Sequence, residues 1–256
     1  MRWRERDGIR WLAAELPGAE AAFTTRAGGG SKPPFASLNL GVLTGDDEAA
    51  VRANRAALAA ALGIDPDRIA IGRQVHEAAI ARHEGPQDPA PYATAGVLPP
   101  EVDGHWTQVS ALALLVFVAD CLPIALATPQ GVAMLHGGWR PLAAGIVDGG
   151  VDALAGSGPI SAAIGPGIGP CCFEVGEEVV AAFAGLGPGV SAPSKATPGK
   201  HMLDLPEVAS RLLGRRGVAV AERSELCTRC NPDLFFSHRG EGPETGRQAG
   251  IVWRAA

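Results

Sequence analysis

Three side chains that could bind a metal ion follow short apolar runs at well-separated places in the chain. They are His76, Cys121 and His136. Each run predicts a β-strand, and the ends of strands in a layered α/β domain meet at a common crevice. Two imidazoles and one thiolate form a three-ligand set that leaves one position open, as in catalytic rather than structural zinc sites. By residue type alone, each could instead be a packed core residue. The surrounding motifs are therefore needed to distinguish a metal ligand from a core residue.

Short polar and glycine-rich motifs follow one another in a specific order between Phe23 and Trp253. Together they resemble the laccase-domain family of bacterial proteins, which are known as multicopper polyphenol oxidoreductases, peptidoglycan editing factors and purine nucleoside phosphorylases. No single motif is decisive, but their order and spacing are highly specific. The matching segments are 24–29 (TTRAGG), 37–41 (SLNLG), 45–47 (GDD), 54–55 (NR), 74–76 (QVH), 119–124 (ADCLPI), 136–140 (HGGWR), 164–166 (IGP), 173–176 (FEVG), 235–239 (FFSHR) and 245–247 (TGR).

This resemblance implies both a metal and an architecture. In the family, the His, Cys and His of three of these motifs bind zinc, which implies that His76, Cys121 and His136 do so here. It also implies a four-layer α/β/β/α sandwich. The residue pattern by itself indicates only an α+β (mixed α/β) layered fold, because strands and helices are interspersed. We found no internal repeat and no clear linker, so residues 1–256 are expected to form a single domain.

The positions of individual elements follow from periodicity and capping signals. The segment 46–48 (DDE) offers an N-cap and a negatively charged first turn for a helix that runs to about Leu62 and is stopped by Gly63. A strand over 69–75 is expected to end at His76, with 78–82 as its candidate hairpin partner. Further predictions are strands over 111–118, 124–127, 132–135, 160–164, 218–221 and 250–253, helices over 142–154 and 206–213, and an irregular excursion over 185–200.

Four more residues are candidates for the active site. Arg26 and Arg140 lie beside glycine-rich segments and could bind phosphate through the guanidinium fork, although either could form a surface salt bridge. Asn39 could bind substrate or shape a turn. Asp120 directly precedes Cys121 and could orient a metal ligand, or point the other way along the strand.

The remaining cysteines allow several interpretations. Cys227 and Cys230 form a CxxC that could be a redox pair or half of a zinc site, but no second CxxC completes four ligands. Cys171 and Cys172 are adjacent and are not expected to pair with each other. Structural packing is therefore the favoured interpretation of the CxxC. Segment 165–170 (GPGIGP) departs from GxGxxG and argues against a nicotinamide site.

Composition and charge exclude other classes of protein. Hydrophobic residues make up 46% and charged residues 19% of 256, as in a globular protein. A net charge of −5 without a basic tract argues against nucleic acid. The charged N-terminal segment lacks a signal-peptide core, so a cytoplasmic location is expected. Pro123 and Pro129 break the apolar run 111–135 into strand lengths, which argues against a membrane span.

Three functions are compatible with these features. The resemblance favours a zinc-dependent purine nucleoside phosphorylase that acts with phosphate on adenosine, inosine, guanosine or methylthioadenosine, with adenosine deamination as a further activity. A copper-dependent phenol oxidase is the alternative, with Met134 as an axial ligand on the strand of His136; the chain's six histidines argue against the trinuclear cluster of a true laccase. A role in editing peptidoglycan precursors is the third. The absence of a GxSxG motif argues against serine hydrolysis.

Overall fold

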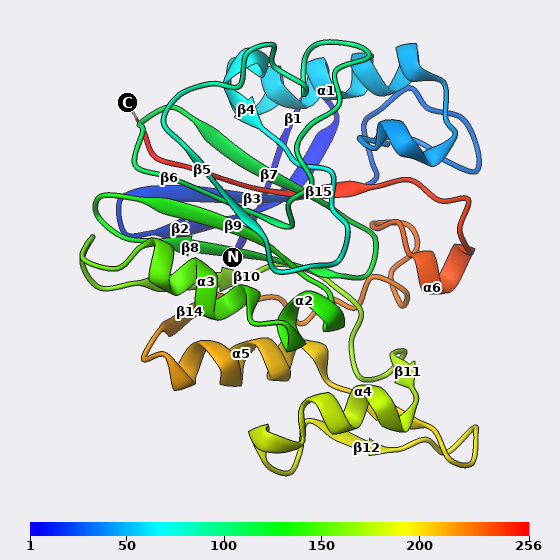
Figure 1. Cartoon of the computed structure of the whole chain (residues 1–256). Coiled ribbons are helices and arrows are strands. Elements are labelled where there is room, and N and C mark those ends of the chain that lie inside the picture. The colour runs from blue at the N-terminus through cyan, green and yellow to red at the C-terminus, as the bar shows by residue number, and fades with distance from the viewer. Residues whose placement is uncertain (256) are drawn as a thin grey trace.

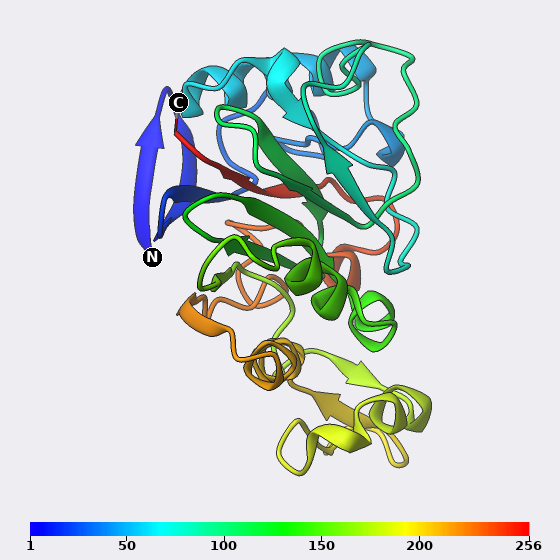
Figure 2. The same cartoon turned by 60° about the vertical axis from the view of Figure 1, so that its left-hand side comes forward.

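Two six-stranded sheets lie face to face in the computed structural model, which describes residues 1–255 (Figures 1 and 2). The first sheet has the order β1 (Arg2–Arg6), β2 (Ile9–Leu16), β3 (Ala19–Thr24), β15 (Gln248–Trp253), β7 (Ala113–Val118) and β4 (Ile69–Ala70). The second has the order β14 (Ala219–Arg223), β10 (Ser161–Ile164), β8 (Leu122–Ala127), β9 (Val132–Gly137), β6 (Gly104–Thr107) and β5 (Ile80–His83).

Helices cover the outer face of each sheet and complete four layers. Helix α1 (Glu48–Leu62) covers the first sheet, and α2 (Trp139–Ala143), α3 (Ile146–Ala153) and α5 (Leu205–Arg215) lie on the side of the second (Figure 1). Strand β7 shows why the layers form, because its buried residues alternate between two cores. Leu114 and Val116 face the second sheet, whereas Ala113 and Leu115 pack in the cluster that includes α1. The predicted single-domain α/β/β/α sandwich is therefore confirmed.

Helix α1 begins and ends where its capping residues predict. The side chain of Asp47 accepts a hydrogen bond from the backbone N–H of Ala50 at 2.8 Å. Gly63 ends the helix in the left-handed conformation, with φ of 71°. The buried face of α1, which includes Val51 and Leu58, covers the first sheet.

Three predicted elements near the candidate ligands are wrong. Only Ile69–Ala70 of the expected strand 69–75 forms β4, because the chain turns away before His76, whose φ is 63°. Residues 78–82 do not form a hairpin with it: β5 belongs to the other sheet, where it pairs parallel with β6. The expected helix over 142–154 is broken into α2 and α3 at Gly145, which has φ of 92°.

The segment expected to be irregular over 185–200 contributes to a small third sheet. Strand β12 (Ser191–Pro193) pairs with β13 (His201–Leu203), which also pairs with β11 (Glu174–Val175). This sheet and α4 (Glu177–Ala182) stand at one end of the molecule (Figure 2). The other short elements are η1 (Val42–Thr44), η2 (Pro66–Arg68), η3 (Ala184–Leu186) and α6 (His238–Glu241). No helix within residues 1–255 is both long and apolar enough to cross a bilayer.

Close approach of the two sheets makes Gly250 of β15 sensitive to substitution. A Cβ at this position would collide with the Cβ of Pro123 in β8. We expect Gly250→Ala to lower the free energy of unfolding by about 1–3 kcal/mol through overpacking, as measured by urea denaturation. Gly85→Ala, where an added Cβ meets no atom within 4 Å, is the control, and equal stability of the two variants would contradict this account of the packing.

Candidate metal centre

His76, Cys121 and His136 converge at one end of the sandwich. His76 lies on the loop after β4, Cys121 on the turn between β7 and β8, and His136 in β9. Strand pairing places Leu122 opposite Gly137, which brings Cys121 beside His136. One potential ligand atom from each of the three lies within 4.8 Å of the others, and Cys121 Sγ is 4.0 Å from His76 Nε2. The structure therefore brings together the three residues that the sequence singled out, with donors suited to a metal ion.

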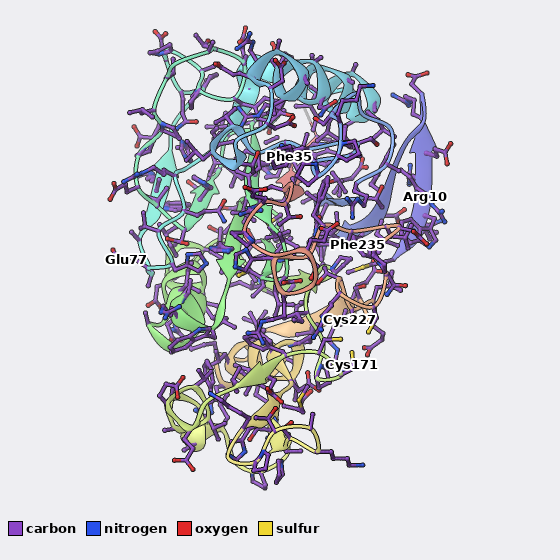
Figure 3. All side chains as sticks on the ribbon, turned by 90° about the vertical axis from the view of Figure 1, so that its right-hand side faces the viewer. Arg10, Phe35, Glu77, Cys171, Cys227 and Phe235 are labelled. Atoms are coloured by element: carbon purple, nitrogen blue, oxygen red, sulfur yellow. The ribbon has the colours of Figure 1, made fainter. Side chains whose placement is uncertain are left out.

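A buried carboxylate, Asp103, holds both histidines in place. Its Oδ1 lies 2.7 Å from His136 Nδ1 and accepts a hydrogen bond from the backbone N–H of His76 at 3.0 Å. Its Oδ2 accepts two more, from the backbone N–H groups of Val75 and Glu77, each at 3.0 Å. Because Nδ1 of His136 faces Asp103, Nε2 is the nitrogen left for a metal ion. The same contacts stabilise the left-handed turn at His76. The next residue, Glu77, is labelled in Figure 3 and marks the place of this turn in the molecule.

The electrostatics of the group favour a thiolate next to an imidazolium when no ion is bound. Burial would raise the pKa of the Cys121 thiol, but His136 and His76 outweigh it and lower the pKa to about 6. Burial would lower the pKa of His136, yet Cys121 and then Asp103 raise it to about 9. For Asp103, burial is likewise outweighed, chiefly by the hydrogen bond with His136, so that its pKa is lowered. The charge needed for a metal ligand is therefore already present on Cys121.

Two backbone features bring the ligands close together. At Gly138, an added Cβ would lie 3.1 Å from Cys121 Sγ and 3.3 Å from His76 Cδ2, so a side chain there would press on both ligands. Asp120 has φ of 92°, a left-handed value that is uncommon for a residue other than glycine. Such backbone geometry is concentrated at functional sites.

The carboxylate of Asp120 contacts a distant segment rather than a ring of the triad. It accepts hydrogen bonds from Thr228 Oγ1 at 2.6 Å, Ser237 Oγ at 2.7 Å and the backbone N–H of Arg239 at 2.7 Å. A hydrogen bond to a ligand histidine, one of the two roles considered for Asp120, is made by Asp103 instead. Asp120 thus fastens the segment that contains α6 to the turn of Cys121.

The triad lines a cavity of about 470 Å³, a size typical of small-molecule sites. Its walls combine cationic and apolar side chains. The arginines are Arg55, Arg73, Arg140, Arg239 and Arg247, and the larger apolar residues include Leu43, Leu98, Phe117, Trp139, Ile168 and Phe173. The guanidinium of Arg140 stacks on the ring of Trp139 at 4.4 Å. Such a cavity is suited to a ligand with a flat apolar part and an anionic part.

Arg26 and Asn39 lie outside the set of described residues that line this cavity. Arg26 donates hydrogen bonds to the carbonyls of Ala36 and Pro232 and forms an ion pair with Glu241 at 2.7 Å. The side chain of Asn39 is fully buried, and its Oδ1 accepts a hydrogen bond from the backbone N–H of Arg247 at 2.8 Å. Both side chains are therefore placed to fix loops around the cavity, whereas Arg140 lines it.

Sequence reasoning missed Asp103, Arg239 and Arg247 as residues of the site. Arg239 and Arg247 belong to the FFSHR and TGR motifs, which we matched without giving their residues a role. Burial is the main influence on the pKa of Arg247 and lowers it, while Cys121 and Asp120 act in the opposite direction. Asp103 carried a weaker signal, an acidic residue between a proline-rich loop and an apolar run, which could not reveal its partners.

The chain belongs to the family described as multicopper polyphenol oxidoreductase laccase, whose model matches residues 20–255. Among curated relatives, it is 40% identical to the protein named purine nucleoside phosphorylase YlmD of Geobacillus stearothermophilus, over 95% of this chain and 94% of that protein. It is also 40% identical to the protein named purine nucleoside phosphorylase SCO2081 of Streptomyces coelicolor, over 92% of this chain and 96% of that protein.

Solved structures share the fold along nearly the whole chain. The crystal structure of YlmD from Geobacillus stearothermophilus superimposes with a TM-score of 0.86 at 35% identity, covering 99% of this chain and 98% of that one. The crystal structure of the hypothetical protein YfiH from Bacillus licheniformis gives a TM-score of 0.88 at 32% identity, with 98% of each chain covered.

The thiolate–imidazolium pair predicts unusual reactivity of Cys121 after chelator treatment. Because the pKa of Cys121 is lowered to about 6, its alkylation by iodoacetamide should rise with pH around 6 rather than around 9.0, the ordinary pKa of a cysteine thiol. Asp103→Asn should move this rise to higher pH, because it removes the negative charge that supports protonated His136. The measurement is mass spectrometry of the peptide containing Cys121.

Asp67→Asn, at an exposed position in η2, should leave the alkylation profile of Cys121 unchanged. A wild-type profile that rises only near pH 9 would contradict the lowered pKa.

Proposed function

We propose that this protein is a zinc-dependent purine nucleoside phosphorylase in which His76, Cys121 and His136 bind the metal. The observation that carries the proposal is the convergence of these three donors on an arginine-lined cavity. The names of the relatives support the reaction. The substrates would be inorganic phosphate and a purine nucleoside such as adenosine, inosine, guanosine or methylthioadenosine.

The donor set fits zinc on chemical grounds. Zinc accepts imidazole nitrogen and thiolate sulfur, and three protein ligands leave one position for substrate or water. The pKa of Cys121, lowered to about 6, supplies the thiolate, and Asp103 presents His136 through Nε2. When bound, the metal would supply a Lewis acid at the wall of the cavity.

The cavity residues have distinct roles in this proposal. Arg140 and Arg247 bind the phosphate, because guanidinium groups match phosphate oxygens in geometry and charge. The purine lies against apolar walls that include Phe117 and Phe173. In the reaction, a phosphate oxygen forms a bond to the anomeric carbon, the glycosidic bond breaks, and the purine leaves with the electron pair and takes up a proton. Holding both substrates in this arrangement would provide much of the rate.

Three residues support the site without contacting the phosphate. Asp120 fastens the segment of Arg239, Asn39 holds the backbone of Arg247, and Arg26 pairs with Glu241 at the end of α6. These contacts argue for a positioning role rather than the direct phosphate contact first expected of Arg26. Their effect on catalysis would come through the geometry of the cavity walls.

An assay of phosphorolysis also distinguishes this reaction from two other activities. Deamination of adenosine would release ammonia and inosine without phosphate consumption. Phenol oxidation would require copper, and Met134, the expected axial ligand, is fully buried in the core between the sheets. The names of the curated relatives favour phosphorolysis over both. A cell-wall editing function would use the same cavity.

Removal of one ligand tests the proposal directly. We expect Cys121→Ala to lose one equivalent of zinc per chain and to reduce phosphorolysis of adenosine by at least about 100-fold, more than is typical when an outer-shell partner is lost. Metal is measured by mass spectrometry of the digested protein, and activity by phosphate-dependent release of adenine and ribose 1-phosphate.

His201→Gln, in the small third sheet, is the matched control for Cys121→Ala and should keep both zinc and activity. Full phosphorolysis by the Cys121→Ala variant would refute the proposal, as would copper in the wild-type protein without nucleoside turnover.

The phosphate-binding role of Arg140 can be tested separately from the metal. We expect Arg140→Ala to raise KM for phosphate about 10-fold or more while zinc content stays unchanged, because one charge-assisted contact is worth about 1.5–3 kcal/mol. Arg52→Ala, at a partly exposed position of α1 and paired only with Glu48 among the described residues, is the control. An unchanged KM for phosphate in Arg140→Ala would argue against this contact.

A further inference from the structure

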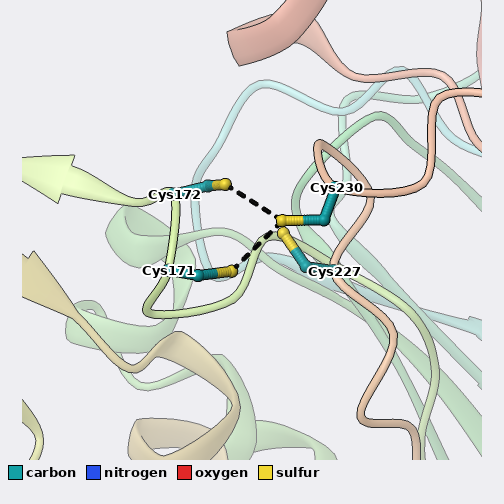
Figure 4. A group of neighbouring side chains, drawn as sticks. All are labelled: Cys171, Cys172, Cys227 and Cys230. Carbon is teal, nitrogen blue, oxygen red and sulfur yellow. Dashed lines mark hydrogen bonds between the residues drawn. The ribbon is translucent and has the colours of Figure 1, made fainter.

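Four cysteines outside the cavity converge at a second place in the molecule. Cys171 and Cys172 lie on the turn that precedes β11, and Cys227 and Cys230 lie on the turn that follows β14. Their sulfur atoms all lie within 4.8 Å of one another. Figure 4 shows the two pairs on different segments, with their side chains directed toward a common point, and Figure 3 places Cys171 and Cys227 near each other in the whole molecule.

We propose that Cys171, Cys172, Cys227 and Cys230 form a tetrathiolate site for a divalent zinc ion, separate from the candidate metal centre. This proposal does not depend on the nucleoside phosphorylase reaction. It replaces the packing role that the sequence favoured for Cys227 and Cys230. The sequence argument required a second CxxC, but the adjacent Cys171 and Cys172 complete the set once the chain folds.

The distances match a metal site better than a disulfide. Cys230 Sγ lies 3.5 Å from Cys171 Sγ and 3.4 Å from Cys172 Sγ. Four sulfurs at about 2.3 Å from one zinc ion, arranged as a tetrahedron, would be about 3.8 Å apart. A disulfide requires about 2.05 Å, and all five cysteines of the chain are free thiols. Small adjustments of the side chains would therefore complete a tetrahedron around one ion.

The exposure of the group also argues against simple packing. Unpaired cysteine behaves as a small apolar residue and is usually buried. Here Cys171 and Cys230 are exposed, Cys172 is half-buried, and only Cys227 of these four is buried. A cluster of thiols at the surface gains little from the hydrophobic effect, whereas thiolates gain strongly from a shared zinc ion.

Backbone contacts already hold the two segments in place for a metal ion. Gly167 forms a parallel β-bridge with Cys227, and the backbone N–H of Thr228 donates to the carbonyl of Gly167 at 3.0 Å. The backbone N–H of Gly169 donates to Cys227 Sγ at 3.3 Å, the kind of hydrogen bond that supports a ligand sulfur. The turn therefore presents Cys227 in a fixed position, and the other three sulfurs lie around it.

Such a site would have a structural role, because four protein ligands leave no open position. It would cross-link two segments that both reach the cavity. The first segment includes Ile168 and Phe173, which line the cavity. The second segment runs from Cys227 to Arg239, another lining residue, and its Thr228 donates a hydrogen bond to Asp120. The ion would thus fix two walls of the cavity relative to each other without contacting the substrate.

Zinc titration of chelator-treated, reduced protein separates the two sites. We expect two equivalents per chain to bind to the wild-type protein, one to Cys121→Ala, and one to the double variant Cys227→Ser/Cys230→Ser. If the candidate metal centre binds no zinc, the wild-type protein should bind one equivalent, which Cys121→Ala keeps and the double variant loses. Failure of the proposed function and failure of the tetrathiolate site therefore give different results.

X-ray absorption of zinc-loaded Cys121→Ala tests the ligands even if the double variant fails to fold. All four cysteines of the cluster remain in this variant, and we expect a shell of four sulfurs at about 2.3 Å. A shell with nitrogen or oxygen ligands would overturn the proposal. So would the absence of bound zinc from Cys121→Ala, or undiminished zinc binding by the double variant.

Discussion

The contacts of one buried carboxylate, Asp103, determine the geometry of the candidate metal centre. Asp103 accepts hydrogen bonds from three consecutive backbone N–H groups, those of residues 75–77, and its Oδ1 lies 2.7 Å from Nδ1 of His136. It therefore fixes the loop that carries one histidine ligand and the ring of the other. A buried anion with this many donors is stable because its charge is fully compensated. The left-handed backbone at His76 persists because these hydrogen bonds hold it.

The layered core provides the frame in which this carboxylate can act. Strands β8 and β9 are completely buried between the first sheet and the outer helices, so their register is strongly specified. That register sets Cys121 next to His136, and β6, which pairs with β9, begins directly after Asp103. The cavity forms where these strands end and loops from both sheets meet. A rigid frame with irregular loops at one end is the arrangement in which a site keeps its geometry while its loops carry the chemistry.

Asp120 and the four-cysteine cluster connect this frame to the later part of the chain. Asp120 binds Thr228, Ser237 and Arg239. Thr228 lies between Cys227 and Cys230, two of the four cysteines of the proposed tetrathiolate site. The segment from the CxxC to α6 has little regular structure, so its position depends on these few polar contacts. The family model matches residues 20–255, so the match includes this loop segment as well as the strands.

Local patterns in the sequence determined the types of ligand, the helix caps of α1 and the layered α/β class, because each depends on neighbouring residues or on a simple period. The resemblance to a family added the four-layer order. The tertiary structure alone decided the partners of Asp103, which are 26–33 residues away in sequence, and the meeting of Cys171 and Cys172 with a CxxC more than 50 residues later. It also decided that Arg140 lines the cavity while Arg26 pairs with Glu241. The physical reason is that the direction of a side chain on a loop is set by long-range hydrogen bonds and packing, which no local pattern of residue types specifies.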